Sequence, residues 1–436
     1  MKNQGFFYLR PMDIKQLHNI FLAHPEVCTD TRKITPNCSF FALKGPNFNG
    51  NAFAKEALDK GAAFAIIDEA DFKVSDQYIL VDHVLETLQE LATFHRNQSQ
   101  VKIISLTGSN GKTTTKELIF SVLSKKYKTI ATQGNLNNHI GVPLTLLSIQ
   151  KDTEMAVVEM GANHQKEIAF LSSIAQPDFG YITNFGKAHL EGFGGVEGVI
   201  KGKSELYDYL IAHDKYVFMN ADDPIQRKKL SSYHKKMGYS ATDFKFYPIQ
   251  LVESNPFVVI KVEDIEISTQ LTGAYNFTNC CVAILMGKYF NVALSDIKSA
   301  LEEYVPENNR SQIIEKNGIK IILDAYNANP TSMSMAIQNF DYMKTEDSCL
   351  ILGDMFELGE AAAEEHQAIV DLAQSLGFIK VLLVGNHFYE TQTAFPKFQT
   401  FEDLTKHLQS HPINRGSLLI KGSRGMALER ILDHLW

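Results

Sequence analysis

The sequence predicts an α/β protein of several domains, in which open, mostly parallel sheets are covered by helices. One observation is a repeated succession of short apolar segment, loop and helical pattern from Val101 onward, which is typical of a parallel sheet flanked by helices. The other is the length of 436 residues, because domains usually run about 100 to 200 residues. We expect a small α/β domain at 1–99, a central parallel-sheet domain at 100–307 and a further open α/β domain at 308–436.

The composition excludes several classes of protein. Hydrophobic residues make up 44% and charged residues 21% of the chain, which is typical of a soluble globular protein. The formal net charge of −8 disfavours binding to nucleic acid or to anionic membranes. The longest apolar runs, such as residues 62–67, fall far short of the roughly 20 residues that span a bilayer. The start of the chain lacks a basic region followed by a long apolar core. We therefore expect a cytoplasmic protein without membrane insertion.

The cysteines indicate buried reduced thiols rather than a metal or redox centre. Their number is odd, and none stands in a Cys-x-x-Cys pair. The five are Cys28, Cys38, Cys280, Cys281 and Cys349.

The first domain is expected to combine short strands with one clear helix. Residues 39–43 and 63–67 are apolar segments separated by turn-rich pieces. A helical pattern of Leu85, Leu88, Leu91 and Ala92 closes this part. The polar stretch at 96–100 then predicts a linker.

The central and last domains repeat the alternation of strand and helix. In the central part, Leu118, Ile119, Val122 and Leu123 fall on one helical face. A break near residues 305–310 separates this part from the last domain. Strands are expected at 101–106, 154–160, 179–184, 216–220, 319–323, 348–352, 381–384 and 417–420.

The strongest local signal is a loop between a predicted strand and a predicted helix. A phosphate cradle needs small residues, so that backbone N–H groups point at the anion where the helix dipole favours negative charge. It also needs a lysine for the β- and γ-phosphates and a hydroxyl for Mg²⁺, which Lys112 and Thr113 supply. Leu106 stands where the usual motif has its first glycine, but the strand–loop–helix context compensates. The predicted nucleotide-binding residues are Thr107, Gly108, Ser109, Asn110, Gly111, Lys112 and Thr113.

Three further residues could complete such a site. Glu159 ends a predicted strand, where a carboxylate would meet Mg²⁺ beside the loop. His189 lies in the glycine-rich segment 186–195 and, on its own, is interpreted as a loop or packing histidine. Lys203, on its own, is interpreted as a solvated surface lysine.

The motifs taken together resemble those of a known family. Residues 107–117 resemble the loop of the Mur ligases, the ATP-dependent amino-acid ligases of peptidoglycan assembly. Within this family the chain is most similar to the members that join D-alanyl-D-alanine to UDP-N-acetylmuramoyl-tripeptide (UDP-MurNAc-tripeptide). The other matching stretches occur in the family's order and cover nearly the whole chain; they are 30–32, 40–45, 135–143, 159–163, 182–194, 324–330, 352–359 and 421–424.

The resemblance implies a three-domain ligase with two magnesium ions. The first domain would hold the UDP end of the substrate, the P-loop domain would bind ATP, and a C-terminal Rossmann-like domain would bring in the dipeptide. Lys112 and Thr113 would serve the phosphates and the first Mg²⁺. Glu159 would bridge to magnesium, and His189 would help to hold a second ion. Lys203 matches a lysine that is carbamylated in the family, which turns a cation into a carboxylate-like metal partner.

The resemblance also implies binding roles for further residues. Asn276 and Asn279 match the segment beside the adenine, while Arg310 and Asp324 match residues near the ATP phosphates and ribose. The residues implied to bind the UDP substrate are Thr31, Arg32, Lys44, Asn137 and Asn138.

Three positions depart from the family pattern. Residues 49–51 read Asn-Gly-Asn where the family commonly has Asp-Gly-His, so no uridine contact is predicted there. Tyr275 stands where many members carry histidine, which leaves its stacking role open. Arg310 follows Asn309 where many members have Gly-Arg, so its alignment is less secure than that of Asp324.

The resemblance implies that ATP activates the substrate carboxylate as an acyl phosphate, which the amino group of the dipeptide then attacks. This route needs no serine or cysteine nucleophile, and the sequence contains no nucleophile elbow. The rival enzymes are folylpolyglutamate synthase and the Mur ligases that add a single amino acid. Thr31 and Arg32 disfavour the first rival, and the 135–143 block disfavours the second. A non-catalytic nucleotide-binding scaffold is a third alternative, disfavoured because a binding module does not need the second set of metal ligands. A monomer is expected, since no apolar surface heptad or swapped arm stands out.

Overall fold

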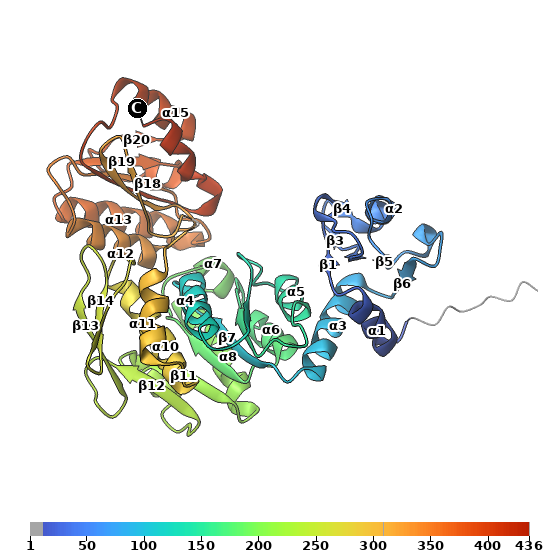
Figure 1. Ribbon diagram of the computed structural model, residues 1–436. Coiled ribbons are helices and arrows are strands. Elements are labelled where there is room, and N and C mark those ends of the chain that lie inside the picture. The colour runs from blue at the N-terminus through green and yellow to red at the C-terminus, as the bar shows by residue number, and fades with distance from the viewer. Residues whose placement is uncertain (1–11, 308, 436) are drawn as a thin grey trace, which may run out of the picture. The chain divides into compact units, whose positions relative to one another are not determined.

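The computed structural model describes residues 12–307 and 309–435. These residues form two compact units. The first contains the chain up to Ser105 together with Lys128–Met160 and Phe170–Asp178, and the second contains Leu106–Tyr127, Gly161–Ala169 and the chain from Phe179 onward. Within the described residues, three open sheets are built mainly of parallel strands (Figure 1), which confirms the predicted α/β class.

The amino-terminal part of the first unit is a parallel sheet with the strand order β1-β2-β5-β6. Side chains of β2 and β5, such as Phe40 and Ile67, pack with Ala54 and Ala57 of α2 in one buried core. The predicted strands at 39–43 and 63–67 are therefore confirmed. The elements are α1 (Ile14–Ala23), β1 (Val27–Cys28), β2 (Ser39–Phe41), β3 (Lys44–Gly45), β4 (Phe48–Asn49), α2 (Ala54–Asp59), β5 (Phe64–Ile67), β6 (Tyr78–Leu80) and α3 (Val84–Gln98).

The predicted linker at 96–100 is wrong for most of its length. Helix α3 continues to Gln98, and Arg96 is buried. The Arg96 guanidinium donates to the Asp178 carboxylate at 2.7 Å and to the Gln176 carbonyl. A polar side chain can be buried at the end of a helix when it is hydrogen-bonded. A polar run in the sequence does not show whether such partners exist, so the run on its own predicts a linker.

A nine-stranded sheet has the order β15-β14-β13-β12-β11-β10-β7-β9-β8. Five of the six residues of β7 are buried, as is usual for the inner strand of a parallel sheet. The predicted strands at 101–106, 154–160, 179–184 and 216–220 correspond to β7, β9, β10 and β11, with ends shifted by a few residues. These strands are β7 (Lys102–Thr107), β8 (Thr129–Ala131), β9 (Met155–Glu159), β10 (Phe179–Ile182), β11 (Tyr216–Asn220), β12 (Lys236–Ser240), β13 (Tyr247–Glu253), β14 (Val259–Val262) and β15 (Ile265–Ser268).

The sequence pattern did not predict that this sheet ends in antiparallel strands. Strands β13, β14 and β15 pair antiparallel and extend the parallel order. Only Ile249 of β13 is buried, so the strand lacks the buried apolar run that is typical of an inner parallel strand.

In the second unit, helix α4 (Lys112–Ser124) follows the phosphate loop and packs against α10 (Tyr275–Tyr289) and α11 (Leu294–Glu303) (Figure 1). The predicted face of Leu118, Ile119, Val122 and Leu123 is fully buried. The other helices of the second unit up to residue 229 are α7 (Leu190–Phe193), α8 (Val196–Ala212) and α9 (Pro224–Lys229). Helix α5 (Gly141–Leu147) belongs to the first unit, and α6 (Glu167–Ala175) begins in a segment of the second unit and ends in a segment of the first.

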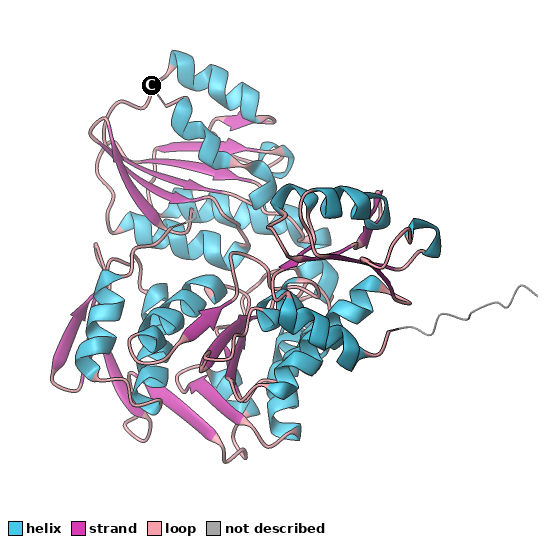
Figure 2. Ribbon diagram, turned by 45° about the vertical axis from the view of Figure 1, so that its right-hand side comes forward, coloured by secondary structure: helices cyan, strands magenta, loops and turns pink. Residues whose placement is uncertain are grey.

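The carboxy-terminal part of the second unit is a six-stranded sheet with the order β16-β17-β21-β18-β19-β20. Only the β16–β17 hairpin pairs antiparallel. Helices lie on both faces of this sheet (Figure 2), and all four predicted strands of this part are confirmed. The elements are β16 (Gln312–Lys316), β17 (Ile319–Asp324), α12 (Pro330–Asp341), β18 (Cys349–Gly353), α13 (Ala362–Ser375), β19 (Lys380–Val384), α14 (Asn386–Tyr389), β20 (Lys397–Phe398), α15 (Phe401–Ser410) and β21 (Ser417–Lys421).

Two expectations from composition can be compared with the structure. All five cysteines are buried, so the predicted burial of these thiols is confirmed. Among the residues that the structure describes, no helix is both long and apolar enough to cross a bilayer.

A buried histidine pair in the first unit predicts loss of stability in acid. The Nε2 of His95 lies 2.9 Å from the Ile149 carbonyl, and its Nδ1 lies 3.0 Å from Nε2 of His18. The contact between the rings needs a donor nitrogen on one and an acceptor nitrogen on the other, so the two histidines cannot both be protonated while it persists. Burial lowers the pKa of both histidines, so below the ordinary histidine pKa of about 6.5 the unfolded chain binds more protons than the native protein.

We expect the free energy of unfolding to fall as the pH drops from 7.5 to 5.5, measured by urea denaturation. The double variant His18→Gln/His95→Gln should show a smaller fall. The variant His213→Gln, which removes an exposed histidine, should keep the wild-type pH dependence, and an equal pH dependence in both variants would contradict this role of the pair.

Candidate active site

The predicted phosphate loop lies between β7 and α4 and has the backbone of a tight cradle. Gly108 and Gly111 have φ angles of +144° and +76°, which side-chain-bearing residues rarely adopt. A Cβ at Gly108 would lie 2.0 Å from the Thr183 hydroxyl, and one at Gly111 would lie 2.7 Å from the Asn279 side-chain oxygen. The turn therefore requires glycine at both positions.

The segment that follows β10 holds this loop in place. The Asn184 carbonyl accepts the Ser109 N–H, and its side-chain oxygen accepts the Asn110 N–H, both at 3.1 Å. The Thr183 hydroxyl and the Asn184 side-chain amide both donate to the Asn110 carbonyl. These hydrogen bonds fix the loop directly before α4, where the helix dipole favours an anion.

The two residues predicted to serve the phosphates begin α4. The Lys112 ammonium donates to the Gly108 carbonyl at 2.8 Å and to the Ser109 carbonyl at 3.4 Å, so the side chain lies along the loop. Thr113 is buried in the first turn. Helix α4 has no acidic residue in its first turn, so no carboxylate of its own offsets the positive end of its dipole there.

The Gly111 conformation leads to a sharp prediction. We expect Gly111→Ala to weaken ATP binding by roughly tenfold or more, because a left-handed residue that carries a Cβ costs about 1–2 kcal/mol and the new methyl group presses on Asn279. Isothermal titration with ATP measures the change. Gly318→Ala is the matched control, since Gly318 has φ +77° with open space around it. Equal ATP affinities of the two variants would contradict the cradle.

Asn276 and Asn279, predicted to lie beside the adenine, are both buried on α10. The Asn279 amide donates to the Asn276 side-chain oxygen at 2.9 Å, and its own oxygen accepts the Thr115 hydroxyl at 3.0 Å. Asn276 donates to the Thr272 carbonyl. These contacts support the base of the phosphate loop, and the adenine contact stays a prediction.

Lys203 is completely buried on α8, so its interpretation as a surface lysine is wrong. Its Nζ donates to the Ala162 carbonyl at 2.9 Å and lies 4.8 Å from the centre of the Phe193 ring. Burial, followed by the charge of Lys112, lowers the pKa of the Lys203 ammonium well below its ordinary value. A lysine whose neutral form is favoured is a nucleophilic amine.

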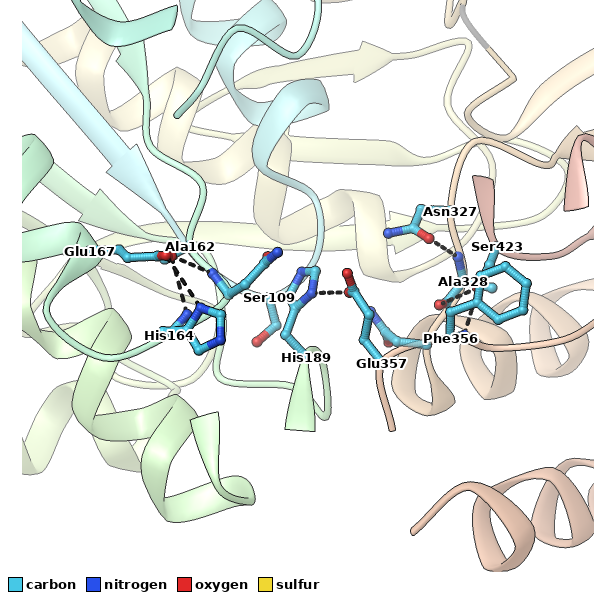
Figure 3. Close-up of polar contacts among 12 residues, drawn as sticks. Ser109, Ala162, His164, Glu167, His189, Asn327, Ala328, Phe356, Glu357 and Ser423 are labelled. Atoms are coloured by element: carbon cyan, nitrogen blue, oxygen red, sulfur yellow. Dashed lines mark hydrogen bonds and ion pairs between the residues drawn. The ribbon is translucent and has the colours of Figure 1, made fainter. Parts of the chain in front are cut away.

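The loop that meets Lys203 is held by two glutamates. Glu167 accepts the N–H groups of Asn163 and His164 at 2.7 and 3.1 Å (Figure 3). Glu205 accepts the N–H groups of Lys166 and Ala169 at 2.6 and 3.0 Å. Lys203 and its carbonyl partner are therefore fixed relative to each other.

Glu159, in the first unit, ends β9 as predicted and is almost fully buried. Its Oε1 accepts the Asn137 amide at 2.7 Å, which brings together two residues that the sequence predicted for different roles. Its Oε2 is buried and has no hydrogen-bond partner within the part of the chain that the structure describes. An unpaired buried carboxylate oxygen is costly unless a cation binds it, so this atom fits a magnesium ligand.

His189 lies in the loop before α7, and its ring faces the carboxy-terminal sheet domain. Its Nδ1 forms a hydrogen bond with the carboxylate of Glu357, a residue that follows β18 (Figure 3). The hydrogen bond with His189 lowers the pKa of Glu357, so Glu357 is ionised at neutral pH. The interpretation of His189 as a packing residue does not account for this contact.

Asp324 and Arg310, predicted to lie near the ATP ribose and phosphates, are held in the carboxy-terminal part. The Asp324 carboxylate accepts the Ser311 N–H at 3.1 Å and the ammonium of buried Lys421 at 2.5 Å. The Arg310 guanidinium stacks 3.5 Å from the centre of the Tyr326 ring, and its buried Nε has no hydrogen-bond partner among the described residues.

The residues predicted to bind the UDP substrate are held locally within the first unit. The exposed Arg32 forms a two-pronged pair with Asp30, and Lys44 lies between Asp68 and Glu69 at 2.9 and 2.8 Å. Thr31 begins a short 3₁₀ helix beside Arg32. Asn138 accepts the Ile140 and Gly141 N–H groups and so starts α5. Contacts of these side chains with a substrate stay a prediction.

No cluster of three or more His, Cys, Asp or Glu side chains that could hold a metal occurs in the described part of the chain. Magnesium often takes one or two protein carboxylates and completes its shell with water and substrate phosphates. The unpaired oxygen of Glu159 fits such an arrangement.

Comparison with known proteins gives this site a context. The chain is 33% identical over 425 residues to UDP-N-acetylmuramoyl-tripeptide--D-alanyl-D-alanine ligase of Bacillus subtilis, an alignment that covers 94% of this chain and 92% of the relative. The chain belongs to the Mur ligase family. The Mur ligase family catalytic domain matches residues 26–96, the Mur ligase middle domain matches 106–287, and the Mur ligase glutamate ligase domain matches 309–424.

Other Mur ligases agree with this assignment. The enzyme of the same name from Escherichia coli is 33% identical over 423 residues, covering 94% of this chain and 93% of the relative. A crystal structure of MurF from Acinetobacter baumannii has a TM-score of 0.83 and 31% identity, covering 98% and 99% of the two chains. The MurF ligase of Thermotoga maritima, solved in complex with ADP, has a TM-score of 0.81 and 26% identity, covering 95% and 97%.

Reasoning from the residues alone missed the burial of Lys203 and the roles of several other residues that shape this Mur ligase site. Lys203 could have been recognised as buried, because Val199, Lys203, Leu206 and Leu210 share one face of α8 at spacings of four, three and four residues. Glu205, Glu357 and Lys421 had no such signal, since each acts on a segment distant in the sequence.

Proposed function

We propose that this Mur ligase joins D-alanyl-D-alanine to UDP-MurNAc-tripeptide at the expense of ATP. The similarity to relatives of that name over nearly the whole length supports the reaction. The pre-formed phosphate loop with Lys112 at its end is the structural observation that supports ATP as the co-substrate. A structural relative that binds ADP agrees with it.

The chemistry requires activation of a carboxylate, because a carboxylate does not react directly with an amine. The terminal carboxylate of the tripeptide attacks the γ-phosphate of ATP, which gives an acyl phosphate and ADP. The amino group of D-alanyl-D-alanine then attacks the acyl carbon and expels phosphate. The loop amides and Lys112 hold the phosphates in place, so positioning and charge neutralisation supply most of the catalysis.

Magnesium is proposed to bind in this site as two ions. Glu159 and Thr113 would hold one ion, and His189 together with Lys203 would hold the other, through the carbamate of Lys203. Bound magnesium would neutralise phosphate charge that develops during the transfer. The unpaired Glu159 oxygen supports the first part of this set.

Carbamylation of Lys203 is proposed because its buried ammonium group does not contact a carboxylate among the described residues. Its Nζ meets a carbonyl and an aromatic ring. Reaction of the neutral amine with CO₂ releases a proton and places a negative group where the ammonium would be costly.

The remaining proposals follow from the same assignment. The domains are proposed at 1–99, 100–307 and 308–436. In support, each of the three family matches, at 26–96, 106–287 and 309–424, falls within one of these ranges. Asn276 and Asn279 would lie beside the adenine, Arg310 and Asp324 would contact the phosphates and ribose, and the UDP substrate would meet Thr31, Arg32, Lys44, Asn137 and Asn138. We propose a cytoplasmic monomer, because the substrates are soluble and one chain carries all the proposed site residues.

Transfer of labelled oxygen tests the proposed reaction. When both oxygens of the terminal tripeptide carboxylate are ¹⁸O, each phosphate released should carry one ¹⁸O atom, measured by mass spectrometry. Phosphate without label would mean that water attacks ATP, and the acyl-phosphate route would then be wrong. Replacing the dipeptide by D-alanine alone separates this function from that of Mur ligases that add one amino acid.

A further inference from the structure

A carboxylate from the carboxy-terminal sheet domain holds the imidazole of His189. Glu357 accepts a hydrogen bond from Nδ1 of His189 (Figure 3), although the two residues are 168 positions apart in the sequence. Both belong to the second compact unit. In metal sites, a carboxylate that accepts one ring N–H of a histidine fixes the tautomer in which the other nitrogen is free to bind the ion.

The backbone at both residues is specialised for this contact. His189 has φ +54° and Glu357 has φ +61°, which is uncommon and unfavourable for residues other than glycine. Left-handed residues outside glycine tend to persist at sites where the surrounding structure holds them for a purpose. The Glu191 N–H also donates to the Glu357 carbonyl at 3.2 Å, so the two loops meet through backbone as well as side chains.

The turn that presents Glu357 is fixed from behind. The Met355 N–H donates to Nε2 of the buried His366 at 3.0 Å, and Nδ1 of His366 lies 2.6 Å from the Ala362 carbonyl. The Phe356 N–H donates to the Ser423 hydroxyl at 2.9 Å (Figure 3). A carboxylate on such a rigid turn can define the orientation of its partner.

The loop of His189 is in turn connected to the phosphate loop. The Ser109 hydroxyl donates to the Gly186 carbonyl at 2.7 Å. The amide of Asn329, in the carboxy-terminal domain, donates to the Asn110 side-chain oxygen at 2.7 Å. The position of His189 is therefore set jointly by the phosphate loop and by the domain that carries Glu357.

We propose that Glu357 is a positioning residue that holds the His189 imidazole with its proton on Nδ1 and its Nε2 available for the second magnesium ion. This inference rests on the proposed function, because that function assigns the ion to His189. It means that the carboxy-terminal domain completes the metal site of the central domain, so that the second ion binds well only when these two domains are in contact.

The matched control is an ion pair that joins the same two segments of the second unit as the His189–Glu357 hydrogen bond does, the loop before α7 and the region after β18. Lys187 stands two residues before His189 in the sequence, and its ammonium lies 2.5 Å from the carboxylate of Glu365 in α13. Removal of Glu365 weakens the contact between the domains without touching the His189 ring. A difference between Glu357→Ala and Glu365→Ala therefore reports on the imidazole and not on domain contact in general.

Nuclear magnetic resonance of ¹⁵N-histidine-labelled protein at pH 8, without metal or substrate, tests the tautomer directly. We expect the His189 signals of the wild type and of Glu365→Ala to show the proton on Nδ1. Glu357→Ala should shift the population toward the proton on Nε2, and Glu357→Gln, which keeps an acceptor, should restore it in part. A wild-type ring protonated on Nε2, or no change in Glu357→Ala, would overturn the proposal.

The magnesium dependence of phosphate release gives the second readout. We expect Glu357→Ala to raise the Mg²⁺ concentration for half-maximal rate by roughly 10- to 100-fold, with a smaller change for Glu365→Ala. Equal magnesium curves for the two variants would leave Glu357 with a docking role only. If the wild type lacks ligase activity, the proposed function fails, while the tautomer measurement still decides the role of Glu357.

Discussion

Replacement of Lys203 by methionine is expected to reduce ligation by roughly 100-fold or more, the loss typical when a group that stabilises transition-state charge is removed. Methionine fills the space beside Phe193, but it cannot carry a carbamate. The initial rate of phosphate release in the complete reaction mixture measures the effect. Short-chain acids such as acetate should restore part of the activity of Lys203→Ala, because they can occupy the space that the side chain leaves.

The control for this prediction lies two residues away on the same helix. Lys201 is exposed on α8, so Lys201→Ala should keep the wild-type rate. Urea denaturation of Lys203→Met distinguishes a chemical defect from misfolding, and we expect a stability close to that of the wild type or greater, since a buried amine is replaced by an apolar group. Wild-type turnover in Lys203→Met would exclude the carbamate.

Replacement of Glu159 by glutamine is expected to have an effect of similar size. Glutamine keeps the shape and can still accept the Asn137 amide, but it removes the negative charge from the oxygen that has no partner. The rate at saturating substrates should fall by roughly 100-fold, and the Mg²⁺ requirement should rise. ATP affinity without magnesium should change little, which isothermal titration measures.

An exposed glutamate provides the comparison for this variant. Glu90 lies on the exposed side of α3, and Glu90→Gln should leave the rate and the magnesium dependence unchanged. If Glu159→Gln kept the wild-type magnesium dependence, Glu159 would instead serve only to anchor Asn137.

Local sequence was sufficient to predict the parts of the fold that local interactions determine. The phosphate loop, the buried face of α4 and the strands β7 and β9 follow from glycine placement and apolar periodicity. The helix end at 96–100 was missed because the polarity of Arg96 is satisfied by Asp178, a residue 82 positions away.

Contacts between distant segments account for most of what the sequence did not reveal about the site. Glu159 was predicted from its place at a strand end, yet its fixation by Asn137 was not. His189 was predicted as a ligand only through the family resemblance, and nothing near it in the sequence indicated Glu357. Such pairs depend on the order of strands in the sheets and on domain contacts, which a single sequence does not display.

The most direct test of the central claim is phosphate release from ATP with magnesium, UDP-MurNAc-tripeptide and D-alanyl-D-alanine, with each component omitted in turn. We predict release only in the complete mixture, together with formation of the UDP-MurNAc-pentapeptide. Release that accepts a single amino acid in place of the dipeptide would contradict the assigned substrate. Absence of release in the complete mixture, despite measurable ATP binding, would mean that the chain is a nucleotide-binding scaffold and not a ligase.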